Sequence, residues 1–189
     1  MDLREPRGWK SRWPTFRRCL VILVVASGCA VTRPLIFSQA RPNPFIGETT
    51  FSLAPTSFSG PLHVGEKTED EYLAENPDDV NKWADAKKSF NDAFTQAVIT
   101  QDLWAPNAKF TVRPTVRSIR PGAYGVSAMF AQKPADLQVE VSIVDQQGNE
   151  LDRIGMHPSS AGISVEDRLG RCGRAAGTMT VEYLRTRLP

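Results

Sequence analysis

Hydrophobic residues recur at helical spacing in two long stretches of the chain, and between these stretches they alternate with polar residues as they do in strands. The first helical stretch spans residues 78–101, and its apolar face carries Val80, Trp83, Phe90, Phe94, Ala97 and Val98. We expect Asn76 to cap this helix, with Pro77 at its first position and Asp79 completing the cap. The pattern predicts an amphipathic helix that lies on a core.

The second helical stretch runs from residue 165 to about residue 188, after Ser164 as the cap and with Asp167 three residues further on. Its apolar stripe carries Val165, Leu169, Cys172, Ala176, Met179 and Tyr183. Gly170, Gly173 and Gly177 lie near this stripe. Each glycine costs about 1 kcal/mol of helix propensity, so either close packing against a neighbour offsets the cost or the helix bends near residues 170–177.

The segment between the two helical stretches predicts strands. Residues 109–119 are rich in β-branched side chains, and Pro114 among them indicates an edge strand or a bulge. Residues 137–143 alternate strictly, residues 145–149 are turn-forming, and residues 150–156 are expected to return as the hairpin partner. Residues 49–53 are a further short candidate strand. The predicted fold class is α+β: a small antiparallel sheet of about four strands with two helices packed on one face, which leaves the other face more polar.

The N-terminal 28 residues have the three parts of a secretory signal. Residues 1–18 carry six basic and two acidic side chains, residues 19–26 are an apolar run, and small residues follow. The run is shorter than the ~20 apolar residues of a membrane-spanning helix. A buried N-terminal helix is the alternative, but its basic residues would then need partners. Removal of residues 1–28 changes the formal net charge from +2 to −2, so the basic balance of the whole chain is no evidence for nucleic-acid binding.

Ala26-Ser27-Gly28-Cys29 resembles the lipobox of bacterial lipoproteins, although the family usually has a large aliphatic residue where this chain has Ala26. The resemblance implies that Cys29 is the lipidation site, that the signal is cut before it, and that Ala30 directs the protein to the outer membrane. An ordinary small-residue cleavage site, which would leave Cys29 as a free thiol, is the alternative. Phe16-Arg17-Arg18 loosely matches a twin-arginine signal, but we expect the ordinary export route. The predicted division is a signal peptide at 1–28, a lipidated N-terminus and flexible tether at 29–48, and the α+β domain at 49–189.

The domain also resembles uncharacterised small envelope lipoproteins with an α/β domain. The resemblance rests on Ile119-Arg120-Pro121-Gly122, Asp145-Gln146-Gln147-Gly148 and Tyr183-Leu184. These motifs are turns and a helix end, so they imply a fold and no activity.

The sequence predicts no catalytic, cofactor-binding or metal-binding residue and no cofactor. His63 and His157 are isolated, and Cys172, the remaining cysteine of the mature chain, lies on an apolar helix stripe. Lys109, Arg113, Arg117 and Arg120 form a basic group. It is expected to pair with the acidic segment 66–92, or else to contact an anionic lipid or polymer.

Three classes of function remain open. The favoured one is a non-enzymatic lipoprotein, anchored to the membrane through Cys29, that binds another envelope protein or polymer through its sheet face, its edge strand or the loop 122–134. A small-ligand-binding periplasmic module and a hydrolase with an unrecognised site are the alternatives. A nucleic-acid partner is not expected, and the oligomeric state is left open.

Overall fold

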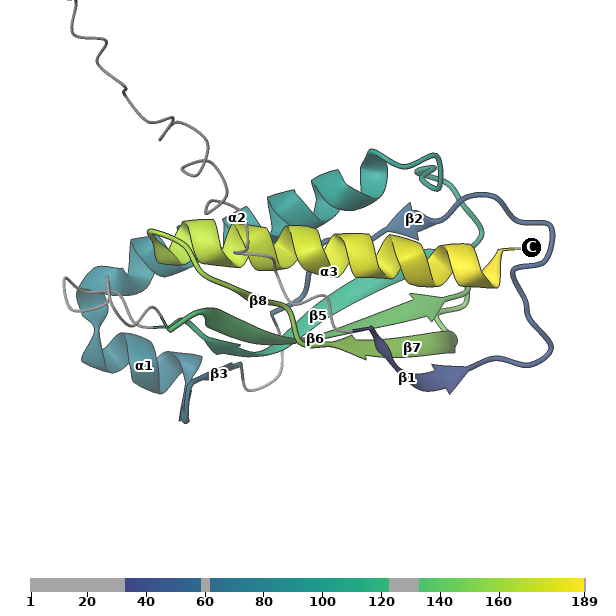
Figure 1. The fold of residues 1–189 in the computed structure, drawn as a ribbon. Coiled ribbons are helices and arrows are strands. Elements are labelled where there is room, and N and C mark those ends of the chain that lie inside the picture. Colours follow the sequence, from purple (N-terminus) through teal and green to yellow (C-terminus); the bar gives the residue numbers. More distant parts are fainter. Residues whose placement is uncertain (1–32, 59–61, 123–132, 189) are drawn as a thin grey trace, which may run out of the picture.

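The computed structural model describes residues 33–58, 62–122 and 133–188 and shows an α+β fold in which one mixed sheet carries two long helices on a single face (Figure 1). The signal, Cys29 and most of the loop 122–134 lie outside the described residues. The strands are β1 (Leu35–Gln39), β2 (Ser52–Leu53), β3 (His63–Val64), β4 (Lys67–Thr68), β5 (Thr111–Arg120), β6 (Ala135–Val144), β7 (Glu150–Met156) and β8 (Ser159–Ser160). The helices are α1 (Glu69–Glu75), α2 (Val80–Ile99) and α3 (Val165–Arg187), with a 3₁₀ turn at Pro77–Asp79.

The centre of the sheet is the predicted antiparallel part. β5 pairs with β6, and β6 pairs with β7 through the turn at Asp145, where Gly148 has a φ of 85° and donates its N–H to the Asp145 carbonyl. The complete strand order is β1-β7-β6-β5-β3-β4, with β2 beside β5 and β8 beside β6. The expectation of about four antiparallel strands is therefore wrong, since the described residues form a sheet of eight strands and both β2 and β3 run parallel to β5. β2 falls within the candidate strand expected at residues 49–53. Of the strands that were not expected, β3, β4 and β8 are two residues each, too short to give a periodic signal, and β1 lies in the segment assigned to the tether.

Pro114 lies in the interior of the sheet and not on an edge strand. Its carbonyl accepts from the Ser57 N–H, so its backbone polar groups face residues 54–57 and not β6. The missing proline N–H therefore removes no donor from the long β5–β6 ladder. The irregularity in this ladder falls at Arg117, between the pairs Val116–Val139 and Ser118–Gln138.

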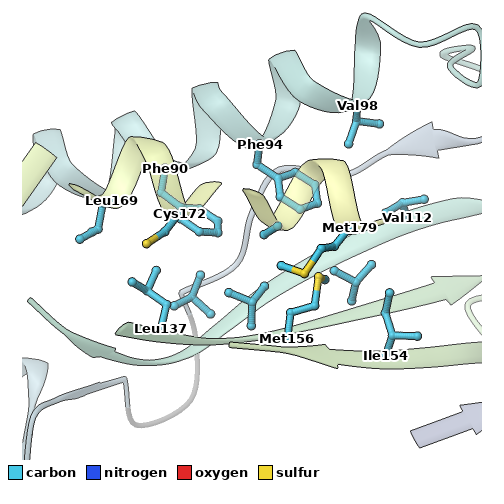
Figure 2. Packing of buried hydrophobic residues seen from close by; sticks show 14 of the residues in the cluster. Phe90, Phe94, Val98, Val112, Leu137, Ile154, Met156, Leu169, Cys172 and Met179 are labelled. Carbon is cyan, nitrogen blue, oxygen red and sulfur yellow. The ribbon is translucent and has the colours of Figure 1, made fainter. Parts of the chain in front are cut away.

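The core fills the layer between the sheet and the two long helices (Figure 2). Alternate residues of β5, β6 and β7 point into it and are almost fully buried: Val112, Val116, Ile119, Leu137, Val139, Val141, Ile143, Ile154 and Met156. Phe90 and Phe94 of α2 and Leu169, Cys172 and Met179 of α3 cover them. Both amphipathic predictions are confirmed, and Ser164 caps α3 by accepting from the Asp167 N–H.

The start of α2 differs from the expectation. Residues 77–79 form a 3₁₀ turn, and the Asn76 side chain makes no cap but donates to the Tyr72 carbonyl at 2.8 Å. Val80, expected on the buried face, is 48% exposed because it begins the helix directly after this turn.

The glycines of α3 make a close contact with α2. A Cβ atom on Gly173 would lie 2.3 Å from the Phe90 carbonyl oxygen, and one on Gly177 would lie 2.8 Å from the Phe94 carbonyl oxygen. The helix is continuous through this region, so the expected alternative of a bend or break is not observed. Close packing is the reason that glycines are present.

Residues 35–48, which were expected to belong to a flexible tether, are part of the folded domain. β1 pairs antiparallel with β7, and Phe45 is fully buried with its ring 4.9 Å from the ring of Phe110. The prolines of this region led to the expectation of a tether. They lie outside β1, the strand that pairs with the edge of β7. The folded part begins before residue 49, where the sequence placed its boundary.

Substitution of Gly173 by alanine tests the helix contact. The added methyl group meets the backbone of α2, which cannot move away as a side chain can, so Gly173→Ala should lower the free energy of unfolding by about 1–3 kcal/mol despite the better helix propensity of alanine. Gly170→Ala is the matched control, because the nearest atom to its Cβ would be the Ser89 hydroxyl at 2.6 Å, a side-chain atom that can rotate, and the nearest backbone atom would lie at 3.7 Å. Urea unfolding monitored by circular dichroism measures both; equal effects of the two substitutions would contradict the packing model.

Candidate functional site

The face of the sheet opposite the two long helices is polar. We define the outer sheet face by the side chains that alternate with the core residues on β5, β6 and β7: Arg113, Thr115, Arg117, Ser118, Arg120, Asp136, Gln138, Glu140, Ser142 and Arg153. Arg113 lies opposite Ser142, which lies opposite Arg153, so one cross-strand row holds two guanidinium groups. Neither α2 nor α3 covers this surface, as the sequence predicted (Figure 1).

Two of the four residues of the expected basic group, Arg117 and Lys109, form ion pairs. Arg117 pairs with Glu140 of the neighbouring strand at 3.1 Å, and Lys109 pairs with Glu48 at 3.2 Å. The expected pairing with segment 66–92 is wrong, because these two ion pairs are made with residues outside that segment. The four lysines of the segment pair with its own carboxylates: Lys67–Glu75, Lys82–Asp79, Lys87–Glu69 and Lys88–Asp92. Lys82–Asp79 and Lys88–Asp92 are three and four residues apart, whereas Lys87–Glu69 joins α2 to α1. Arg113 and Arg120 are exposed on the outer sheet face.

The two histidines, isolated in the sequence, fall in one row across the outer sheet face. His63 lies opposite Ser118 and Ser118 opposite Gln138. The pairs Val139–Met156 and Asp136–Ser159 place His157 opposite Gln138. Sequence spacing gave no sign of this row, since it depends on the parallel pairing of β3 with β5.

A polar hollow of about 180 Å³ lies at this end of the outer sheet face and is lined by Ser118, Arg120, Asp136, Gln138 and His157. These side chains supply hydrogen-bond donors and acceptors and little apolar surface, which suits a polar group of a partner.

An open groove of about 700 Å³ runs along the solvent side of α2 and α3, where Ser89, Gly170, Arg171 and Arg174 are among its lining residues. The small-ligand alternative required a pocket between the sheet and the helices. The groove lies on the other side of the helices, where Gly170 leaves space beside Ser89.

A buried polar cluster joins the C-terminal end of α3 to the edge of the sheet. The Asp152 carboxylate is fully buried; it accepts from the Tyr183 hydroxyl at 2.6 Å, from Arg187 Nε at 2.8 Å and from the Ala40 N–H at 2.8 Å. Burial, together with the hydrogen bond to Asp152, raises the pKa of Tyr183 to about 12. Tyr183 was expected on the apolar stripe, and the sequence did not indicate this cluster. Asp152 occupies a core position of its strand, where its carboxylate is stable only because these partners pair with it.

The remaining residues considered for metal binding or catalysis do not come together into a site within the described residues. Within the residues that the structure describes, no group of three or more His, Cys, Asp and Glu side chains could hold a metal ion. Cys172 is buried, and its Sγ lies 3.6 Å from the Pro158 carbonyl oxygen. None of the helices in the described part of the chain is both long and apolar enough to span a membrane.

Comparison with known proteins gives a distant structural likeness. No protein-family model matches the chain, and no curated protein matches its sequence. A structure of the PelC dodecamer from Paraburkholderia phytofirmans matches with 12% identity and a TM-score of 0.34, over 67% of this chain and 89% of the PelC chain. A dodecamer of a PelC point variant from the same organism matches with 14% identity and a TM-score of 0.31, over 73% and 88%. TM-scores this low carry no argument about function or assembly.

Removal of the buried charge tests the Asp152 cluster. Asp152→Asn leaves the largely buried Arg187 guanidinium without its counterion, so the free energy of unfolding should fall by about 3–5 kcal/mol. Glu140→Gln is the control, since it breaks the more exposed pair with Arg117 and should cost less than about 1 kcal/mol. Chemical denaturation of both variants measures the difference; comparable losses would show that the cluster is no more important than a surface pair.

The raised pKa of Tyr183 predicts a loss of stability at alkaline pH. In the unfolded chain this phenol ionises near its ordinary pKa of about 10, whereas in the folded chain it ionises near 12. The stabilisation is therefore complete below about pH 10 and is lost as the pH rises toward 12. Urea midpoints of the wild type should fall more steeply over this range than those of Tyr183→Phe. Parallel curves for the two proteins would contradict the assignment.

Proposed function

We propose that the protein is a non-enzymatic lipoprotein of the cell envelope, attached through Cys29 to the periplasmic face of the outer membrane, where its outer sheet face binds another envelope protein or polymer. The observation that carries the proposal is the order of segments at the N-terminus: a basic flank, an apolar run too short to span a bilayer, and the lipobox-like Ala26-Ser27-Gly28-Cys29. The division into a signal peptide at 1–28 and a lipidated N-terminus at Cys29 follows from it.

The position of the first strand supports this arrangement. β1 begins at Leu35, so only residues 30–34 separate Cys29 from the folded domain. Several acyl chains on one residue hold a protein stably at a membrane, whereas a single chain binds marginally. A multiply acylated Cys29 would therefore keep the domain close to the bilayer surface.

The outer sheet face supports the binding half of the proposal. It is broad, the two long helices leave it uncovered, and its arginines and amide and hydroxyl groups can donate hydrogen bonds to a polar or anionic partner. Arginine is enriched at protein interfaces and forms bidentate contacts with carboxylates and phosphates.

Substitution of Cys29 tests the anchor. Mass spectrometry of the mature wild-type N-terminus should find an acylated Cys29, and Cys29→Ser should abolish the acylation. The variant should either stay in the inner membrane with an uncut signal or leave the membrane fraction after cleavage by ordinary signal peptidase. Cys172→Ser is the control and should be acylated at Cys29 like the wild type. An unmodified Cys29 in the wild type would refute the anchor.

Charge reversal tests the outer sheet face. Arg113 is exposed, so Arg113→Glu should leave the fold intact while placing a like charge against an anionic partner. Proteins or polymers that co-purify with the wild type from membranes in mild detergent should be recovered about tenfold less with this variant, which corresponds to about 1.4 kcal/mol of binding. Arg174→Glu in the groove beside α2 is the matched control. If Arg174→Glu alone reduces recovery, the partner binds the helical side instead.

A further inference from the structure

The edge strand β1 presents three consecutive apolar side chains to solvent. Leu35 and Ile36 are each 56% exposed and Phe37 is 50% exposed. β1 is the terminal strand of the sheet, and in Figure 1 it lies at the lower edge beside β7; its last residue, Gln39, reaches α3 by donating to the Tyr183 hydroxyl at 3.3 Å. Folded proteins usually protect a sheet edge with charged residues, a proline or a covering element. These three positions have apolar side chains instead.

Packing within the domain accounts for only part of this surface. The Phe37 ring lies over Gly155, where an added Cβ would come within 2.5 Å of the ring, so one side of Phe37 is used in the fold. Leu35 lies opposite Gly155 and Ile36 opposite Ile154, so the two side chains lie on opposite faces of the edge strand, Leu35 on the side of the outer sheet face. In the described part of the chain, no strand pairs with the outer side of β1. We call Leu35, Ile36 and Phe37 the apolar edge.

We infer that the apolar edge contacts the bilayer surface to which Cys29 is anchored. This inference rests on the proposed function, because the anchor brings the membrane to the strand. A fully extended chain spans at most about 3.3–3.6 Å per residue, so Leu35 lies within about 20 Å of Cys29 and Phe37 within about 30 Å. No such limit ties the other exposed apolar residues to the anchor, for example Ile163, which precedes the N-terminal end of α3.

The residues beside the apolar edge fit the same partner. Arg33 precedes β1, Arg41 follows it, and both are exposed. Arginines on either side of an apolar strip match the anionic headgroups and the acyl boundary of a bilayer, where amphipathic surfaces insert to a depth of about 5–10 Å. Contact at this edge leaves both the outer sheet face and the helical layer open to the periplasm.

The test measures the depth of two labels in vesicles. The lipidated protein, purified from membranes, carries Ile36→Cys or, as the matched control, Ile163→Cys, which is also an exposed isoleucine. Each variant is labelled with an environment-sensitive fluorophore and placed in phosphatidylethanolamine–phosphatidylglycerol vesicles that contain acyl-chain quencher lipids. Unsubstituted protein measures any background from the buried Cys172. Leu35→Cys repeats the measurement on the same strand in case one substitution disturbs pairing.

The label at position 36 should be quenched at least about threefold more strongly than the label at position 163, in keeping with insertion of an amphipathic surface. Equal quenching in protein whose Cys29 is acylated by mass spectrometry would overturn the membrane contact and leave the proposed function standing. Energy transfer between labels at position 36 in the absence of vesicles would also overturn it, since a second copy would then occupy the edge. An unmodified Cys29 would remove the proposed function and this inference together.

Discussion

The contact between α2 and α3 at Gly173 and Gly177 sets the geometry on which the rest of the fold depends. Because these glycines have no side chain, the backbones of the two helices approach until Phe90 and Phe94 reach over the sheet and into the core. If α2 and α3 lay farther apart, gaps would remain above β6 residues such as Val139 and Val141. Protein interiors are closely packed and contain few such voids. Both long helices lie on the same face, and the opposite face of the sheet carries polar side chains.

The parts of the fold that are long and regular could be predicted from the sequence. The hairpin around Asp145 and Gly148 and the α3 helix with its Ser164 cap follow from local periodicity and turn chemistry, and both are present. For the glycines of α3 the sequence left close packing and a bend as alternatives, and the structure shows close packing. Strands of two residues such as β3 and the edge position of β1 depend on partners distant in the chain. Pro114 led to the expectation of an edge strand or a bulge, but it lies inside the sheet. A proline is tolerated there when its nitrogen, which has no hydrogen to donate, faces a position where no strand hydrogen bond is needed.

The candidate surfaces were less predictable than the fold, for a related reason. Arg117 and Glu140 meet across two strands, and His63 and His157 share a row only after β3 has aligned with β5. Asp152 offered no sequence signal, since a carboxylate at a core position is stable only once Tyr183 and Arg187 surround it. The N-terminal targeting segment could be recognised because its signals are local in sequence and require no tertiary partner.

The direction of β1 has a mechanical consequence. A force applied to the chain before residue 33 acts first on the pair of Leu35 with Gly155. It would break the β1–β7 hydrogen bonds in order along the strand, starting from this pair. The peeling would proceed toward Gln39 and then meet the Ala40 backbone, which Asp152 and Arg187 hold from both sides. Peeling beyond Gln39 would have to break these hydrogen bonds, so tension is expected to separate the five residues of β1 before it reaches Phe45 and the core.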